Sequence, residues 1–428
     1  MFVEDDLSYI GIREVWEGQE PFGLSTTDRR QHVYCVGKTG TGKTTLLRNL
    51  ILQDLMAGRG IGVIDPHGDL AKELLDLIPR RRSDDLVYFD PSDYDHPIGI
   101  NLFPRVAPRE RHLIASGVVG AFKSIWREFW GPRLEYILYA TIAALQECEN
   151  VSLLGVQRIL VDELYRKWVI RQVKDPAVKS FWAREFASFD KRFLAEILAP
   201  VQNKVGQLLM AAPLRNILGQ VKSKVDLRFM MDSGRIFIAN LSKGRIGEDK
   251  ANLLGALLVT QFQLAAMSRV DTPESERRDF NLYVDEFHNF TTDSFASILS
   301  EARKYRLNLT LSNQYTAQLR PEIRDAVFGN VGTIMSFRVG QADAFILERE
   351  FGGRFTAAQF AELANHHIYV KSIHDDISLV PFAASTLASI PIRDGCGEQL
   401  IRRSREKYAS KLAVVENKLS RWAERRRF

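Results

Sequence analysis

Eight residues near the start of the chain combine glycines, a lysine and a threonine in an order that suits phosphate binding. Gly37 to Thr44 read GKTGTGKT, which fits the pattern G-x-x-x-x-G-K-[ST]. In that pattern backbone N–H groups curl around the phosphates, Lys43 reaches the outer phosphates and Thr44 ligates Mg²⁺. The residues expected to hold the nucleotide are Gly37, Lys38, Thr39, Gly40, Thr41, Gly42, Lys43, Thr44 and Thr45. The expected cofactors are therefore ATP and Mg²⁺.

Two adjacent carboxylates far downstream offer the second half of such a site. Asp285 and Glu286 follow the mostly apolar run Phe280–Val284. We expect Asp285 to share the Mg²⁺ shell with Thr44, and Glu286 to polarise the attacking water as a general base. The alternative interpretation is that Asp285 and Glu286 are two solvated acids at the end of a strand. Hydrolysis, as opposed to nucleotide binding alone, therefore depends mainly on Glu286.

These residues need a strand, a turn and a helix to position them, and the flanking sequence predicts all three. The apolar run Val33–Val36 predicts a buried strand before the loop, and residues 45–52 predict a helix after it. The N-terminus of that helix adds its positive dipole end to the phosphate site. Further strands are predicted at 60–65 and 85–90. Strands that alternate with helices indicate an α/β fold with a mainly parallel sheet, which binds nucleotide at the carboxyl ends of its strands.

The strand signal disappears over the middle of the chain and then returns. From about 105 to 225 apolar residues recur at helical spacing, for example at Leu134, Ile137 and Leu138, and we interpret this stretch as an all-helical insertion. Strands are predicted again at 234–240, 281–285, 307–312, 333–338 and 367–371. The predicted parts are an N-terminal lead-in without strong periodicity (1–30), the first part of the ATPase domain (31–104), the helical insertion (105–230), the second part of the ATPase domain (231–390) and a basic C-terminal helical tail (391–428).

Composition narrows the class of protein. Hydrophobic residues make up 45% of the 428 residues and charged residues 26%, which is typical of soluble globular chains. The three cysteines are widely separated and lack metal-ligand spacing, which fits a reducing compartment. The N-terminus has no apolar signal core, and the apolar stretch 251–267 contains polar residues that favour a buried helix. We therefore expect a cytoplasmic protein with no intrinsic membrane span.

The net charge of +5 is concentrated at one end of the chain. Residues 401–428 contain ten Lys or Arg and three Glu, a net charge of +7, so residues 1–400 sum to −2. Any nucleic-acid surface on the body must then be local, such as a narrow channel. The tail also carries an apolar stripe at heptad-like spacing: Tyr408, Leu412, Val415, Leu419 and Trp422. We favour packing of this stripe on the protein itself over a coiled coil, and a solvated end over a binding patch for the basic cluster 425–427.

Several segments taken together resemble the HerA/FtsK superfamily of hexameric DNA-pumping ATPases, nearest to the coupling ATPases of conjugation and type IV secretion. The matching segments are FGLSTTDRRQHVYCVGKTGTGKTTLL (22–47), GVIDPHGDLA (62–71), WGPRLEYIL (130–138), RIFIANLSKGRIGED (235–249), LYVDEFHNF (282–290), LSEARKYRLNLTLSNQY (299–315) and GNVGTIMSFRVG (329–340). The nucleotide motifs occur in many families, whereas EARKY…NQY and the helical insertion are more specific. The resemblance implies a RecA-like P-loop ATPase that forms a homo-oligomeric ring, expected to be a hexamer, with DNA in its central pore.

The resemblance also implies roles for two residues that follow the acidic strand. Arg303 lies 17 residues after Glu286, where such ATPases carry an arginine that reaches into the neighbouring subunit's site. Gln314 matches a polar residue that senses the γ-phosphate. A surface charge is the alternative for Arg303, and Arg338 is a weaker second candidate for the same role.

Two other segments attract attention but support weaker expectations. Asp65 ends a predicted strand, and we expect Pro66 and Gly68 to set a turn near the site, with Asp65 supporting the groups that contact the nucleotide. A metal role for His67 is rejected because no partner His or Cys lies at ligand spacing. The segment 243–245, with the sequence KGR, is a candidate DNA-contacting loop.

Three functions remain open from the sequence. The first is a motor that translocates DNA without reading its sequence. The second is a nucleotide-gated ring scaffold for a partner nuclease or for a secretion or relaxosome component, and the third is an ATPase that moves protein. Membrane-bound coupling proteins carry N-terminal membrane helices, and this sequence shows none. We therefore expect either a soluble motor or an anchor on a separate protein.

Overall fold

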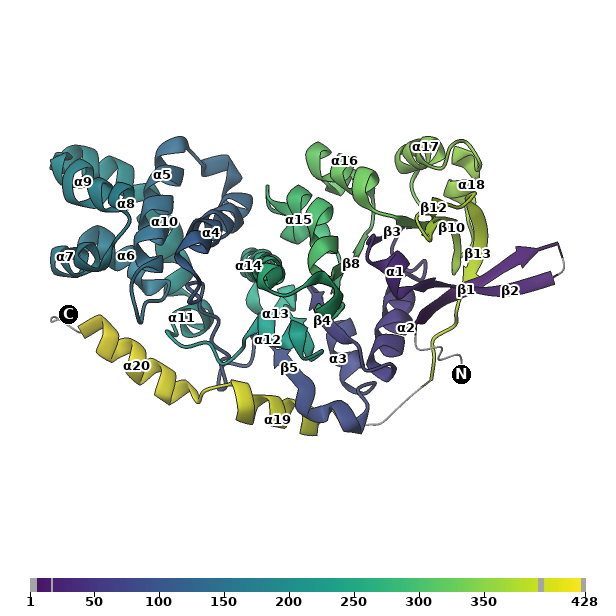
Figure 1. The fold of residues 1–428 in the computed structure, drawn as a ribbon, viewed down its shortest axis with the longest axis horizontal. Helices are drawn as coiled ribbons and strands as arrows, with labels where there is room; N and C mark the ends of the chain where they lie inside the picture. The colour runs from purple at the N-terminus through teal and green to yellow at the C-terminus, as the bar shows by residue number, and fades with distance from the viewer. Residues whose placement is uncertain (1–5, 17, 392–395, 425–428) are drawn as a thin grey trace. The chain divides into compact units, whose positions relative to one another are not determined.

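The computed structural model describes residues 6–16, 18–391 and 396–424, and the chain forms two units. The first unit comprises Met1–Tyr88, Leu227–Ser242 and Ala265–Arg403, and it contains the sheet and the nucleotide motifs. The second comprises Phe89–Asp226, Lys243–Leu264 and Ser404–Phe428, and it is helical (Figure 1). The site described below lies entirely in the first unit.

An eleven-stranded sheet runs through the described part of the first unit in the order β2-β1-β13-β10-β9-β3-β8-β7-β4-β6-β5. The central strands pair in parallel, as expected for an α/β fold. These strands are β3 (Val33–Val36), β4 (Gly60–Asp65), β6 (Ile236–Asn240), β7 (Phe280–Val284), β8 (Leu307–Asn313) and β9 (Thr333–Ser336), with β5 (Leu86–Phe89) at the edge. Their bounds agree to within one or two residues with the strands predicted from the sequence. Every residue of these seven strands is buried.

The other side of the sheet continues with antiparallel strands. They are β10 (His367–Lys371), β13 (Phe382–Thr386), β1 (Leu7–Val15) and β2 (Gly18–Ser25). Residues 1–30 were described from the sequence as a lead-in without strong periodicity, and no strand was predicted there, whereas the described residues of this segment include β1 and β2. Six of the nine residues of β1 and seven of the eight residues of β2 are exposed or half-exposed, which agrees with a sequence that lacks the apolar alternation typical of a strand. Pairing with β13, more than 370 residues away in the sequence, holds β1 in the sheet.

Helices pack against this sheet and form its core together with the strands. The helix after the phosphate loop, α2 (Lys43–Met56), is buried at most of its positions. Its leucines pack with β3 and β4 and with α3 (Asp69–Leu75) in one apolar cluster. The remaining helices of this unit include α1 (Thr26–Arg29), α12 (Leu227–Asp232), α15 (Phe295–Glu301), α16 (Pro321–Asn330), α17 (Gln341–Glu350) and α18 (Ala357–Glu362). A short hairpin, β11 (Ile373–His374) and β12 (Ile377–Ser378), lies between β10 and β13 in sequence.

The second unit has no strand after Phe89 in the described residues. Its helices are α4 (Arg111–Ile125), α5 (Pro132–Gln146), α6 (Leu154–Val161), α7 (Glu163–Gln172), α8 (Pro176–Ser180), α9 (Phe186–Ser188), α10 (Lys191–Met210) and α11 (Ala212–Leu218). The unit also includes α13 (Lys243–Ile246), most of α14 (Glu248–Met267) and α20 (Leu412–Glu424). The domain boundaries predicted from the sequence did not group these later segments with the helical insertion. Their packing, for example of Thr260 against Gly117, depends on folding rather than on sequence order.

The tail forms two helices where the sequence suggested one. They are α19 (Gly397–Tyr408) and α20. Between them the main chain bonds to the body: the N–H of Ser410 donates to Pro97 O at 3.2 Å, and that of Leu412 to Asp95 O at 2.9 Å. The apolar stripe packs on the protein, as expected, with Tyr408 and Val415 buried. The cluster 425–427 lies outside the described residues.

The segment Glu248–Asp271 is long and apolar enough to cross a membrane by length and composition, and it is 61% buried in the fold. It contains α14, in agreement with the predicted buried helix. A core helix of a soluble domain has the same properties, so this segment is weak evidence for a membrane span.

Candidate nucleotide and hydrolysis site

The phosphate loop joins the carboxyl end of β3 to the first residue of α2. Gly40 and Gly42 adopt φ values of 77° and 117°, which glycine accepts without strain. A Cβ on Gly37 would lie 2.5 Å from Cβ of Phe337, so the loop can pass this point only as glycine. Residues 38–40 are exposed, and the loop therefore presents its backbone to solvent at the N-terminus of α2.

The Lys43 ammonium is buried against the loop itself. Nζ donates to the carbonyl oxygens of Gly37 and of Lys38, the second at 3.1 Å. Burial lowers the pKa of Lys43, while the nearby carboxylates of Glu286 and Asp285 act in the opposite direction. The lysine thus lies beside the predicted acidic pair, where phosphate oxygens can replace the two carbonyls.

Strand register brings the acidic pair to the same edge of the sheet as the phosphate loop. β8 lies between β3 and β7, with Val36 opposite Asn313 and Val284 opposite Leu311. The residues that follow β3, β7 and β8 therefore lie at the same edge of the sheet. The Ser312 hydroxyl donates across the strands to Oδ1 of Asp285.

Asp285 has the properties of a ligand for a hard cation. Burial raises its pKa to about 6, although the Ser312 hydrogen bond opposes the shift. Among the described residues Oδ1 accepts from Ser312 and from the Glu286 N–H, and Oδ2 accepts no hydrogen bond. Carboxylate and hydroxyl oxygens are the donors that Mg²⁺ prefers. Asp285 with the exposed Thr44 hydroxyl therefore fits the predicted metal site.

Glu286 and Gln314, predicted from different segments, lie in direct contact. Nε2 of Gln314 donates to Oε1 of Glu286 at 2.9 Å. Oε2 of Glu286 is buried without a hydrogen-bond partner among the described residues, and it lies 3.5 Å from Nδ1 of His288. The backbone of Glu286 adopts φ 46°, in the left-handed region that non-glycine residues rarely occupy. A strained residue with an unsatisfied buried acceptor suits a group that binds and activates water.

The structure does not bring Arg303 into this site within one chain. Its guanidinium is about half exposed, and Nη2 lies 3.3 Å from Oδ1 of Asp376. This exposed location is compatible with action on a neighbouring subunit, which stays a prediction. Arg338, the weaker candidate, follows β9, and its carbonyl accepts from the Lys38 N–H at 2.8 Å. Arg338 therefore lies beside the phosphate loop of its own chain.

Two further segments that were singled out from the sequence make contacts within the fold. Both carboxylate oxygens of Asp65 accept backbone N–H groups, from His67 at 2.8 Å and from Ala71 at 2.9 Å, and so they cap α3. This is the turn that the sequence analysis expected. The KGR segment forms α13 in the second unit, where Lys243 pairs with Glu248 at 3.2 Å.

Three residues next to the site were not identified from the sequence. Ser312 was detectable in principle, because it precedes Gln314 by two residues on a predicted strand. His288 follows the acidic pair by two residues but carries no motif. His366 donates its backbone N–H to Thr41 O at 2.9 Å, and its ring packs against Gly42. No local pattern connects His366 with a loop more than 300 residues earlier.

The fold and the phosphate loop together define the RecA-like P-loop ATPase fold. Residues 21–344 match the family described as type IV secretion-system coupling protein DNA-binding domain, and the chain belongs to this family. No curated protein matches the chain.

Solved structures with the same fold are distant in sequence. The unbound conjugative coupling protein TrwB is 15% identical, with 87% of this chain and 88% of that chain covered and a TM-score of 0.62. TrwB with the ATP analogue ADPNP is 17% identical, with coverage of 86% and 87% and a TM-score of 0.63. VirB4 of Thermoanaerobacter pseudethanolicus is 13% identical, with coverage of 89% and 96% and a TM-score of 0.57. These likenesses establish the RecA-like fold.

Proposed function

We propose that this protein is an ATP-hydrolysing ring motor that moves DNA in a type IV secretion or conjugation system. The observation that carries the proposal is the contact of Glu286 with Gln314, together with the buried Oε2 of Glu286, which has no hydrogen-bond partner among the described residues. A site for nucleotide binding alone has no need of such a group. TrwB has been solved with ADPNP and with ADP and Mg²⁺, which supports ATP and Mg²⁺ as the cofactors here.

Each residue of the site has a distinct part in the proposed reaction. Lys43 would exchange the carbonyls of Gly37 and Lys38 for the outer phosphates, and Thr44 and Asp285 would hold a Mg²⁺ that would neutralise phosphate charge. Oε2 of Glu286 accepts the proton of the attacking water.

Two further residues complete the site. Gln314 donates to the other oxygen of Glu286, and its role as sensor of the γ-phosphate is what the resemblance implies. Arg303 of a neighbouring subunit stabilises charge on the transferring phosphoryl group, which makes hydrolysis depend on ring assembly. The ring is expected to be a hexamer.

The family description favours DNA over protein as the cargo, since it names a DNA-binding domain of a secretion-system coupling protein. Sequence-independent grip on DNA requires basic groups that neutralise phosphates in a pore. Relaxosome or secretion components are the expected partners. A nucleotide-gated scaffold remains the competing proposal, and it predicts no DNA-stimulated turnover.

The decisive measurement is the ATPase rate of the intact chain with no DNA, with double-stranded DNA and with single-stranded DNA. We expect stimulation by DNA, loss of nucleotide binding in Lys43→Ala, and retained binding without turnover in Glu286→Gln. Lys72→Ala, at an exposed lysine on α3 outside the phosphate loop, is the matched control for the first variant. ATP turnover that DNA leaves unchanged would favour the scaffold, and near-normal turnover in Glu286→Gln would remove Glu286 from the role of base.

A further inference from the structure

The turn between β11 and β12 has an unusual conformation for its residues. Ile373 pairs with Ser378 and His374 with Ile377, which leaves Asp375 and Asp376 as a two-residue loop. Their φ values of 49° and 62° both lie in the left-handed region. Hairpins of this kind strongly prefer Asn-Gly or Asp-Gly, because a Cβ at the second position is crowded. Glycine is favoured at the second loop position, so the aspartate found there, Asp376, indicates a functional role for its carboxylate.

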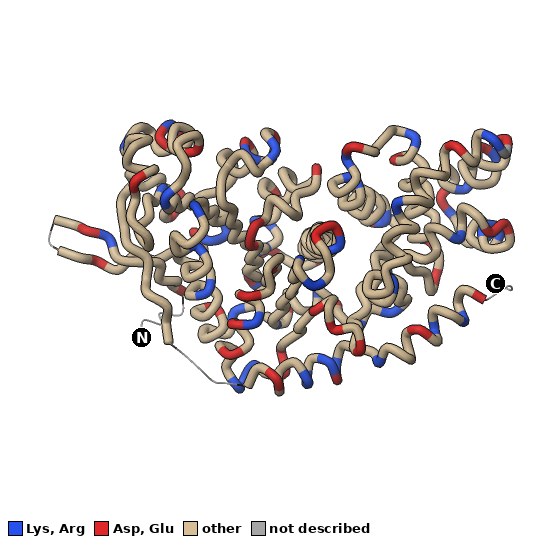
Figure 2. The backbone as a smooth tube through the Cα atoms, turned by 180° about the vertical axis from the view of Figure 1, so that it is seen from behind, with Lys and Arg blue, Asp and Glu red and all other residues tan. Residues whose placement is uncertain are grey.

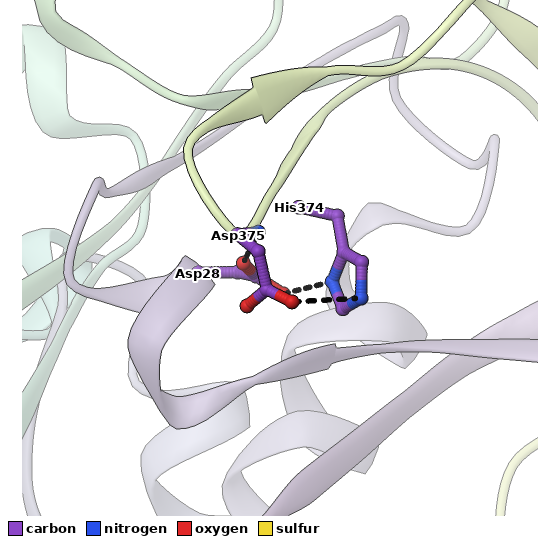
Figure 3. A group of neighbouring side chains, drawn as sticks. All are labelled: Asp28, His374 and Asp375. Atoms are coloured by element: carbon purple, nitrogen blue, oxygen red, sulfur yellow. Dashed lines mark hydrogen bonds and ion pairs between the residues drawn. The ribbon is translucent and has the colours of Figure 1, made fainter.

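The first side of the turn is fastened to the start of α1. Nδ1 of His374 lies 3.0 Å from Oδ2 of the buried Asp28, and the N–H of Asp375 donates to Oδ1 of Asp28 at 3.2 Å (Figure 3). Nε2 of His374 lies 3.7 Å from Oδ2 of Asp375. The three side chains could offer atoms to a cation, but hydrogen bonds within the protein already use both oxygens of Asp28. The group is therefore better explained as a clasp that fixes the turn.

The second side of the turn meets Arg303. Oδ1 of Asp376 lies 3.3 Å from Nη2 of Arg303 and accepts from Nε2 of Gln31 at 2.8 Å. The three residues come from distant segments, after α1, before β8 and between β11 and β12. With the clasp holding the turn, Asp376 is the one acidic partner of Arg303 among the described residues.

We propose that Asp376 is a positioning residue for Arg303. A guanidinium has five donors in a planar fork, so a carboxylate on Nη2 leaves Nε and Nη1 to meet a phosphate. Holding one edge of the fork limits the rotamers of a long, half-exposed side chain before the neighbouring nucleotide arrives. Gln31 in turn orients the carboxylate. This inference rests on the proposed role of Arg303 across the subunit boundary.

Asp376→Gly provides the test, because glycine suits the left-handed turn and removes only the carboxylate. Asp375→Gly is the matched control, since it makes the same change at the neighbouring position and leaves the Arg303 pair intact. With DNA present, we expect Asp376→Gly to lower kcat roughly 10-fold, with KM within about 2-fold of the parent chain. Asp376→Asn, which keeps the acceptor oxygen but not the charge, should recover part of the loss, and Asp375→Gly should retain the parent kcat.

Combination with Arg303→Ala separates this inference from the proposed function. If Arg303 acts as proposed, Arg303→Ala loses most turnover, and adding Asp376→Gly causes no further loss. An unchanged or raised kcat in Asp376→Gly while Arg303→Ala is inactive would overturn the positioning role alone. Full turnover in Arg303→Ala would instead overturn the proposed role of Arg303 and the inference with it. Equal losses in the two glycine variants would also overturn the positioning role, because they would indicate a structural effect of the turn.

Discussion

At the scale of single residues, the site separates two adjacent carboxylates by their surroundings. Asp285 is buried, accepts from Ser312 and has a pKa raised to about 6, which suits an oxygen ligand that releases its proton when a cation binds. The backbone of Glu286 is left-handed, and its carboxylate accepts a hydrogen bond from the Gln314 amide instead of from a hydroxyl. Neighbouring positions in sequence can therefore take different chemical roles.

We expect Gln314→Ala to lower kcat roughly 10- to 100-fold and to leave nucleotide affinity nearly unchanged. The reason is that Oε1 of Glu286 loses its donor, so the carboxylate is no longer fixed toward the attacking water. Steady-state ATPase assays beside fluorescent-nucleotide titrations would measure the two effects. Gln341→Ala, at an exposed glutamine on α17, is the control. Normal turnover in Gln314→Ala would show that Glu286 is positioned by other contacts.

At the scale of elements, a buried ionic network joins three segments around the sheet. Arg29 of α1 contacts both carboxylate oxygens of Asp54 on α2, at 2.7 and 2.9 Å. Tyr283 of β7 donates to Asp54 at 2.6 Å and accepts from Arg29 at 2.7 Å. The helix that begins at the phosphate loop is thereby tied to β7, the strand that Asp285 follows.

Removal of Arg29 should destabilise the first unit strongly. Arg29→Ala leaves the Asp54 carboxylate buried with less compensation, at a cost of about 3–5 kcal/mol in the free energy of unfolding. Arg30→Ala, the matched control, removes a partly exposed pair with Asp279 and should cost about 1 kcal/mol or less. Urea-induced unfolding followed by circular dichroism would compare the variants. Equal midpoints for the two would show that the network contributes little.

The clasp on the β11–β12 turn should depend on pH. The hydrogen bond from His374 to Asp28 raises the pKa of His374, and Asp375 adds to that shift. A raised histidine pKa means that the stabilisation is complete below about pH 6.5 and is lost as pH rises through the raised value. We expect the exchange protection of the Asp375 amide to fall as pH rises above about 6.5, after correction for the intrinsic rate. The same profile should be flat in His374→Gln, and a matching fall there would exclude the histidine as its cause.

At the scale of the whole molecule, basic and acidic residues are mixed along the chain. Figure 2 shows Lys and Arg interspersed with Asp and Glu along α19 and α20. Several of the basic residues pair with acids, for example Arg405 with Asp93 at 2.6 Å. The tail therefore acts in part as a structural element, although it carries the basic excess of the sequence.

Subunit mixing tests whether the site is shared between chains. Arg303→Ala and Glu286→Gln subunits should each be inactive alone, because each lacks one half of every site. Mixed rings should recover part of the turnover, since some interfaces then pair an intact Glu286 with an intact Arg303. ATPase assays across mixing ratios would detect the recovery. Absence of recovery in rings that still assemble would contradict action in trans.

Trp422 should stabilise the second unit. Its ring lies under the guanidinium of Arg158, 4.9 Å from the ring centroid, and meets Tyr165 edge-on at 5.9 Å. We expect Trp422→Ala to lower the melting temperature of the helical unit by several degrees, because a 2–3 kcal/mol loss is typical of such partly buried aromatic contacts. Lys418→Ala, on the exposed side of α20, is the control. Thermal shifts should differ between the variants while the salt dependence of DNA binding stays the same.

The sequence by itself determined the elements whose signals are local. The phosphate loop, the strand before it, the acidic strand and the helical insertion were predictable, because glycine spacing and apolar periodicity reflect geometry within a few residues. These features also carried the resemblance that the family match confirms.

The tertiary structure decided what depends on partners distant in the chain. The β1–β2 hairpin could not be recognised, because its order comes from β13 at the other end of the sequence. The Ser312–Asp285 bond, the packing of His366 on the loop and the meeting of Asp376 with Arg303 follow from strand register and turn placement. Single polar side chains carry no periodic signal, so only the folded chain shows which of them share a site.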